Sequence, residues 1–256
     1  MGVTLGAFSV TVLGCDGGYQ APGGACSGYL VRAGSTRLLL DSGPGTLANL
    51  QRYVGLDELD AVVLSHDHPD HWSDIEGLAV ARQYALSAPA GAPADSTARE
   101  RVRVLAPKGL REITYHCRGD AFDWREVTDG SKATVGALEL RFSRTDHGPE
   151  TLGVRVSAFG RVLAYSADTG PKWSLGRLGG GIDVGLCEAT FTSAHEGSAR
   201  HLSARQAGTQ ARDAAVRRLV VTHRWPTVAQ DEIVSEAAEA FGDSVIPASQ
   251  GLTIDL

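Results

Sequence analysis

The sequence predicts an α/β protein built as a four-layer αββα sandwich. Of its 256 residues, 43% are hydrophobic and 21% are charged, which is typical of soluble globular enzymes. In each half of the chain a β-rich stretch alternates with helical patterns, without a short sequence repeat. The simplest assembly packs two sheets against each other and covers each with helices. We expect one domain that spans residues 1–256.

Hydrophobic periodicity places the elements of the first half. Apolar residues at every second position mark strands, and apolar residues three or four apart mark helices. Ser87–Glu100 is rich in Ala, Pro and Ser and has no period, so it is predicted to be a mobile loop and a lid candidate. The expected strands are residues 8–13, 29–32, 37–40, 59–64 and 103–106; the expected helices are a helix opened by residues 41–45 that runs to about 53, then 72–86 and 109–117.

The second half is β-rich from Phe122 and then helical. Two Ser/Thr-x-x-Gln capping boxes predict where its helices begin. Ser203 with Gln206 opens a helix to about residue 215, and Thr227 with Gln230 opens a helix that stops at Gly242. The expected strands are residues 137–143, 152–157, 161–166, 184–187 and 218–222.

Four residues of metal-ligand type lie within a six-residue motif between a predicted strand and a predicted helix. Buried imidazoles without partners cost free energy, and protonated neighbours repel each other. A divalent cation removes both penalties, because neutral imidazole and carboxylate are its natural ligands. A purely structural zinc site is less favoured, since such sites are usually Cys-rich. The four residues are His66, His68, Asp70 and His71.

Three further candidate ligands follow three separate strands: His147, Asp168 and His223. Taken singly, each is compatible with a capping or surface role. Taken together, they supply what the motif lacks for a site with two metal ions. Strand ends at one edge of a sheet are where open α/β folds usually place their ligands.

These motifs, in this order and over almost the whole chain, resemble the metallo-β-lactamase superfamily. The resemblance implies the αββα fold and two divalent metal ions, with Zn²⁺ as the default for His-rich ligands and Mn²⁺ or Fe as alternatives. It also implies that Asp41 in LLLDSG is a structural carboxylate near the site. By the same resemblance His66, His68 and His147 hold one metal, Asp70, His71 and His223 hold the other, and Asp168 bridges them.

The bridging Asp168 differs from the true β-lactamases, in which a Cys commonly takes that role. Glu188-Ala189-Thr190, followed by His201-Leu202-Ser203, is similar to the phosphodiesterase branch that includes tRNA 3′-processing endonuclease, although Cys187 stands where that branch carries a His. The similarity implies that His201, beside a capped helix N-terminus, faces the phosphate and acts as general acid, with Asp70 and Asp168 completing the catalytic set. Asp67 is either a supporting acid or a solvent-facing loop carboxylate.

A small cyclic phosphodiester, such as a cyclic nucleotide, is the favoured substrate. Only 20 residues separate His147 from Asp168, enough for a hairpin but not for the long basic arm of the tRNA endonuclease. The net charge of −6 also argues against RNA as a broadly gripped partner. Three alternatives stay open: a tRNA 3′-processing-like endoribonuclease, a lactone or thioester hydrolase that does not need His201, and a non-enzymatic metal-binding module.

Cysteine usage and hydropathy predict the compartment. Cys15, Cys26, Cys117 and Cys187 form no CxxC pair, which favours reduced thiols. No apolar run approaches 18 residues, and no basic-plus-apolar signal region is present. We expect a cytoplasmic protein that has a small-molecule substrate and no membrane partner, with a homodimer as the default assembly.

Overall fold

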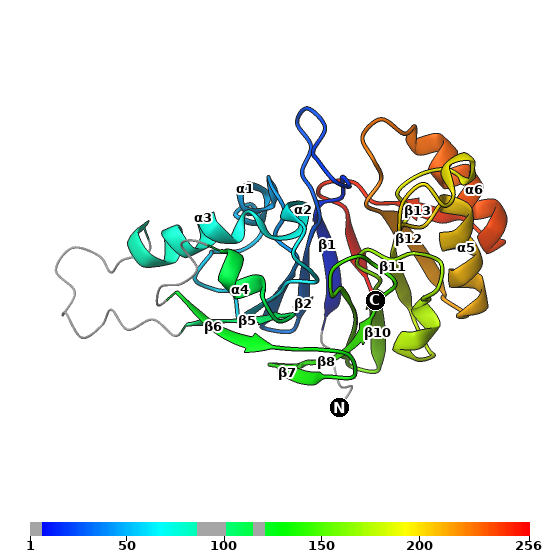
Figure 1. The fold of residues 1–256 in the computed structure, drawn as a ribbon. Helices are drawn as coiled ribbons and strands as arrows, with labels where there is room; N and C mark the ends of the chain where they lie inside the picture. Colours follow the sequence, from blue (N-terminus) through cyan, green and yellow to red (C-terminus); the bar gives the residue numbers. More distant parts are fainter. Residues whose placement is uncertain (1–6, 86–100, 115–120) are drawn as a thin grey trace, which may run out of the picture.

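The computed structural model describes residues 7–85, 101–114 and 121–256. Figure 1 shows two sheets that lie side by side, with helices on the outer side of each. The lid predicted over Ser87–Glu100 lies outside the described residues, as does part of the helix predicted over residues 109–117. Among the described residues, no helix is long and apolar enough to cross a membrane.

The first sheet joins the N-terminal strands to one C-terminal strand. Strands β14 to β3 of its order run antiparallel, and β3 to β6 run parallel. In the described chain its order is β14 (Thr253–Asp255), β1 (Phe8–Gly14), β2 (Gly28–Ala33), β3 (Thr36–Leu40), β4 (Ala61–Val63), β5 (Val102–Ala106) and β6 (Phe122–Glu126).

The second sheet repeats this plan with the later strands. Strands β13 to β10 run parallel, and β10 to β7 run antiparallel. In the described chain its order is β13 (Val245–Pro247), β12 (Arg218–Thr222), β11 (Val184–Glu188), β10 (Arg161–Tyr165), β9 (Leu152–Ala158), β8 (Leu138–Arg144) and β7 (Lys132–Val135).

Three apolar clusters separate four layers, which confirms the predicted αββα sandwich. One cluster lies between the sheets and includes Tyr29 and Val156. A second joins the first sheet to its helices through residues such as Leu39 and Leu78, and a third joins the second sheet to its helices through residues such as Val221. The covering helices are α1 (Thr46–Leu50), α3 (Ile75–Val80) and α4 (Leu110–Ile113) on one side and α5 (Ala204–Asp213) and α6 (Gln230–Phe241) on the other.

The helix predicted over residues 72–86 is wrong at its start and in its continuity. A first short helix, α2 (Pro69–Trp72), begins inside the ligand motif, because proline is favoured in the first turn of a helix. After a break, α3 follows and continues into a π-helical segment, Ala81–Ala85. The early start places Asp70 and His71 on a helix rather than in a loop.

One of the two predicted capping boxes is confirmed and the other is wrong. The Ser203 hydroxyl oxygen accepts a hydrogen bond from the Gln206 backbone amide, and the Gln206 side-chain oxygen accepts one from the Ser203 backbone amide. Helix α6 begins two residues later than a Thr227 box requires, with Ala229 at its N-cap and no side-chain cap bond. Its predicted stop is confirmed, since Gly242 has a φ of 84°. The short strands β13 and β14 were not predicted, because three residues carry too little alternation.

Candidate metal centre

The ligand candidates gather where strands of both sheets end. His66 lies just beyond β4, and Asp70 and His71 lie in α2. In the second sheet His147, Asp168 and His223 lie beyond β8, β10 and β12. The fold therefore unites residues up to 157 positions apart in the chain at one edge of the sandwich.

The Asp168 carboxylate lies at the centre of the cluster. Its Oδ1 is 3.3 Å from Nε2 of both His71 and His223. Its Oδ2 is 3.4 Å from His66 Nε2 and 3.8 Å from His147 Nε2. One carboxylate thus faces histidines from both predicted metal positions, which is the geometry that a bridging ligand requires.

The remaining candidates pair within each predicted position. His68 Nδ1 is 3.2 Å from His147 Nε2, and Asp70 Oδ2 is 3.2 Å from His223 Nε2. Each of the two predicted ligand sets offers one atom per residue, all within 4.8 Å of one another, and Asp168 joins the first set. A third grouping of this kind contains Asp168, His201 and His223. Asp67, by contrast, is exposed, which favours its interpretation as a solvent-facing carboxylate.

Several buried polar atoms in the cluster have no hydrogen-bond partner among the described residues. They are His66 Nε2, His71 Nε2 and both carboxylate oxygens of Asp168. Buried groups of this kind normally find a partner, and leaving one unsatisfied costs about 1–3 kcal/mol. Because they converge on one another with lone pairs available, a divalent cation fits this donor set.

The Asp41 carboxylate orients two of the histidines. Its Oδ2 accepts a hydrogen bond from His71 Nδ1 at 2.8 Å and from the Tyr165 hydroxyl at 2.6 Å. The Ser65 hydroxyl also donates to Oδ2, so its oxygen is free to accept from His66 Nδ1 at 3.0 Å. Both imidazoles therefore carry their proton on Nδ1 and present a bare Nε2 to the cluster.

In the second sheet the Glu188 carboxylate orients two further histidines. Its Oε1 is 3.0 Å from His201 Nδ1, and its Oε2 accepts a bond from the Thr190 hydroxyl at 2.7 Å. The Thr190 oxygen in turn accepts from His223 Nδ1 at 3.0 Å. Asp41 and Glu188 each hold one histidine directly and a second one through a hydroxyl. The sequence signals Glu188 only through its resemblance, because hydrogen-bond partners cannot be read from spacing.

Local backbone strain accompanies the site. Asp41, Ala167 and His223 have φ values of 57°, 51° and 55°, a region that costs non-glycine residues of order 1–3 kcal/mol. The glycine-rich turn after β1 closes against this site: a Cβ on Gly17 would lie 2.4 Å from the His223 carbonyl oxygen. The next residue, Gly18, donates its amide to Asp70 Oδ2 at 2.8 Å. At Gly17 a side chain would not fit, because the backbone of the turn itself lies against His223.

The charge states suit a cation. Burial lowers the pKa of His66 to about 4 and also lowers the pKa of His147, which keeps both imidazoles neutral at neutral pH. Burial alone would raise the pKa of the Asp168 carboxyl, but the surrounding histidines hold it well below its usual range. At His71 the neighbouring carboxylates outweigh burial and raise the pKa, so without a cation Nε2 also holds a proton, and a bound cation would take the place of that proton.

A four-layer αββα sandwich with a His/Asp cluster at its strand ends is typical of one class of metal-dependent hydrolases. The chain belongs to the β-lactamase superfamily, since the family model described as "Beta-lactamase superfamily domain" matches residues 36–224. The predicted resemblance is confirmed. Protein ML1173 of Mycobacterium leprae is 37% identical over 99% of this chain and 90% of its own length. The probable metallo-hydrolase YhfI of Bacillus subtilis is 31% identical over 95% of this chain and 98% of its own length.

Solved structures agree with this assignment. The crystal structure of YhfI matches with a TM-score of 0.87 and 27% identity, covering 98% of this chain and all of the other. A diphosphatase from the PhnP family shares the fold with a TM-score of 0.72 at 17% identity, covering 98% and 97% of the two chains. By sequence, Ribonuclease Z of Mycobacterium marinum is 27% identical over 93% of this chain and 95% of its own length.

Proposed function

We propose that the protein is a dinuclear metal-dependent phosphodiesterase that acts on a small cyclic phosphodiester such as a cyclic nucleotide. The observation that carries the proposal is the placement of His201. Its Nδ1 is bonded to the buried Glu188 carboxylate and lies 4.0 Å from Asp168 Oδ2. Its ring stacks on His223 with a centroid distance of 5.3 Å and an angle of 20° between planes. A positioned acid at this place suits the poor alkoxide leaving group of a phosphodiester.

As the resemblance implies, His66, His68 and His147 would hold one cation, Asp70, His71 and His223 would hold the other, and Asp168 would be a ligand to both. The close grouping of these donor atoms supports that arrangement. When bound, divalent cations lower the pKa of water and offset the negative charge that builds on phosphoryl oxygens. Zn²⁺ is the default for so many imidazoles, and Mn²⁺ or Fe are the alternatives.

His201 supplies the proton. Because Nδ1 is bonded to Glu188, Nε2 is the nitrogen that can donate toward substrate. Water attacks phosphorus and loses a proton to solvent as the new P–O bond forms. The bond to the sugar oxygen breaks, that oxygen leaves with the proton from Nε2, and His201 then takes up a proton from solvent. Burial lowers the pKa of His201, but Glu188 more than compensates and raises it to about 9, so the ring is an acid at neutral pH.

The substrate is proposed to be small. The chain between His147 and Asp168 is occupied by the β9–β10 hairpin, which leaves no long arm there for gripping a folded RNA. The Ribonuclease Z and diphosphatase relatives carry phosphorus–oxygen chemistry in their names, which supports the reaction type. Because Ribonuclease Z is also among the relatives, tRNA 3′ processing is the second candidate function for this protein.

The further expectations belong to the same proposal. In the described part of the chain Cys15, Cys26 and Cys187 are free thiols, which supports a reducing compartment such as the cytoplasm. Partners are expected to be the small phosphodiester and a second copy of the chain in a homodimer.

The proposal is tested by measuring turnover with metal-analysed protein on a panel of substrates: bis-(p-nitrophenyl) phosphate, 3′,5′-cyclic AMP, a precursor tRNA, a lactone and a β-lactam. We expect metal-dependent cleavage of the two small diesters, lost in His68→Ala. Cleavage of the lactone alone would leave the fold and metal site intact but reject the phosphodiesterase. Cleavage of the precursor tRNA at the higher efficiency would replace the cyclic substrate by the second candidate.

Removing the charge of Glu188 is expected to shift the pH profile. In Glu188→Gln the charge-assisted bond to His201 is lost, so the alkaline limb of kcat moves to lower pH by about one to two units. KM at pH 6 is expected to change little, because Glu188 acts through His201. Glu232→Gln, an exposed carboxylate on α6, is the matched control. An unchanged alkaline limb in Glu188→Gln would show that His201 is not the titrating acid.

A further inference from the structure

Three cationic side chains lie in one row across the β7 edge of the second sheet. In the strand register Lys132 of β7 is directly opposite Arg141 of β8, and Arg141 is directly opposite Arg155 of β9. Neighbouring strands are about 5 Å apart, and like charges placed directly opposite each other destabilise a sheet. Burial together with the Arg141 charge lowers the pKa of Arg155. Among the described residues, no carboxylate forms an ion pair with any of the three.

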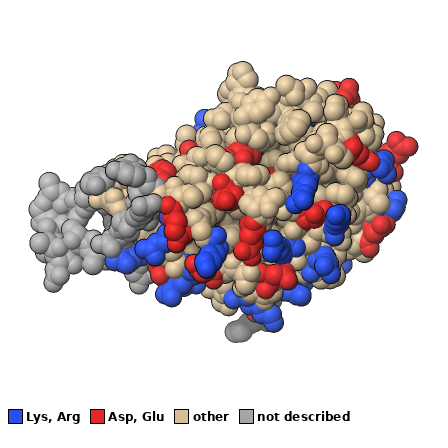
Figure 2. Space-filling view, viewed as in Figure 1, with Lys and Arg blue, Asp and Glu red and all other residues tan. Residues whose placement is uncertain are grey.

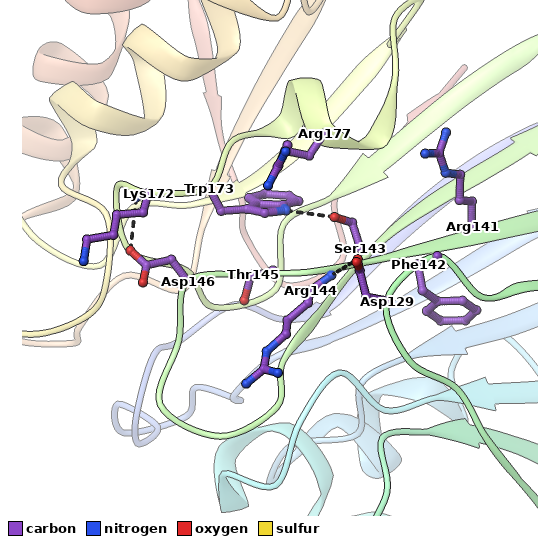
Figure 3. A pocket seen from close by; sticks show the side chains of 11 residues that line it. Asp129, Arg141, Phe142, Ser143, Arg144, Thr145, Asp146, Lys172, Trp173 and Arg177 are labelled. Carbon is purple, nitrogen blue, oxygen red and sulfur yellow. Dashed lines mark hydrogen bonds between the residues drawn. The ribbon is translucent and has the colours of Figure 1, made fainter.

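A fourth cation extends the row. Arg177 lies in the 3₁₀ helix η4 (Leu175–Leu178), which packs on β8 and β9. Arg155 Nη1 donates to the carbonyl oxygens of Leu178 and Gly180 at 3.4 and 3.0 Å, which ties the row to this segment. Figure 3 shows Arg141 and Arg177 on the same side of β8, whereas Arg144 points to the other side.

The row borders two adjoining hollows. An open groove of about 600 Å³ lies over β7–β9 and is lined by Lys132, Arg141 and Arg155, with Glu139 as its one acidic side chain. A pocket of about 510 Å³ shares Arg141 and is lined by four cationic side chains and two carboxylates, Asp129 and Asp146. Volumes of this size suit a small molecule. Figure 2 shows Lys and Arg side chains over the lower half of the face in view, interspersed with Asp and Glu.

We propose that this surface, with Lys132, Arg141, Arg155 and Arg177 as its cations, binds an anion that carries two or more phosphate groups. A chain of phosphates offers several negative charges in a line, which relieves the repulsion along the row, and arginine suits bidentate contact with phosphate. The aromatic rings in the lining, Phe142 and Trp173, are buried, so no platform for stacking successive bases is available. The occupant is therefore a small polyphosphate or a nucleoside triphosphate rather than a single-stranded nucleic acid.

The pocket shares a wall with the cluster of candidate metal ligands. Thr145 and Asp146 line it and lead directly into His147. The Thr145 hydroxyl donates to the Asp168 carbonyl oxygen at 2.6 Å, and the Gly170 amide donates to the Asp146 carbonyl oxygen at 2.6 Å. A ligand in the pocket would thus lie against the segments that carry His147 and Asp168, although the pocket is separate from the candidate metal site.

The test is calorimetric titration of the intact protein with inorganic tripolyphosphate and with ATP. In Arg141→Gln/Arg177→Gln the affinity is expected to fall by about tenfold for each guanidinium removed. Arg52→Gln, an exposed arginine beyond α1, is the matched control and is expected to leave affinity unchanged. The melting temperature of the double variant is expected to be equal or higher, since like charges are removed. Equal affinity for the two probes supports recognition of phosphates alone; tighter binding of ATP supports a nucleotide.

Phosphates also bind metal ions, so His68→Ala is used to distinguish binding at the cationic surface from binding at the candidate metal site. Binding of tripolyphosphate is expected to persist in His68→Ala. Four results would overturn the proposal: no binding to the wild-type protein, equal losses in the double variant and in Arg52→Gln, loss in His68→Ala but not in the double variant, or tighter binding of an RNA oligonucleotide than of tripolyphosphate.

Discussion

Asp168→Asn is expected to lower turnover of every ester that the protein hydrolyses by roughly a thousandfold or more, the scale of losing a principal electrostatic element of a site. The Asp168 oxygens face Nε2 of His66, His71, His147 and His223. Asparagine keeps the shape but is neutral and offers only one oxygen, so it cannot bridge two cations. Elemental analysis of bound metal beside kcat measures the effect.

The same variant has a stability readout that does not depend on activity. A cation that binds only the native state raises its stability, so a chelator is expected to lower the melting temperature of the wild-type protein. Asp168→Asn is expected to respond much less. Asp67→Asn, an exposed carboxylate in the same motif, is the control and should behave as the wild-type protein. Full metal content and normal turnover in Asp168→Asn would refute a bridging role.

His201→Ala is expected to reduce kcat on 3′,5′-cyclic AMP by about 10²- to 10⁴-fold, the range of a positioned general acid. The loss on bis-(p-nitrophenyl) phosphate is expected to be far smaller, because p-nitrophenolate leaves without a proton. For the wild-type protein, kcat on the cyclic nucleotide is expected to fall as the pH rises through about 9, where His201 loses its proton. Bound metal should stay at the wild-type level.

The control for His201→Ala is His195→Ala, since His195 is exposed in the 3₁₀ helix Ser193–His195. Equal losses on both diesters would indicate that His201 binds the substrate or a metal rather than donating a proton. No loss on either would remove it from the mechanism and favour a hydrolase of another ester class.

The sequence predicted the fold well where patterns are local. The apolar run before His66, the alternation over β1 and the Ser203 capping box are set by neighbouring residues, and the structure has each of them. The Thr227 capping box failed because the chain turns before α6 and places Ala229 at the N-cap. Propensity marks a helix more reliably than its first residue.

The sequence by itself predicted the class of the site, because several imidazoles and carboxylates at strand ends together form a set of ligands typical of divalent cations. Only the tertiary structure decided which nitrogen each histidine presents. That choice depends on Asp41 and Glu188, which reach His71 and His201 directly and reach His66 and His223 through the hydroxyls of Ser65 and Thr190. The cationic row over β7, β8 and β9 is likewise invisible in the sequence, since strand register brings Lys132, Arg141 and Arg155 together. Contacts between distant segments are created by packing and register, which no local pattern encodes.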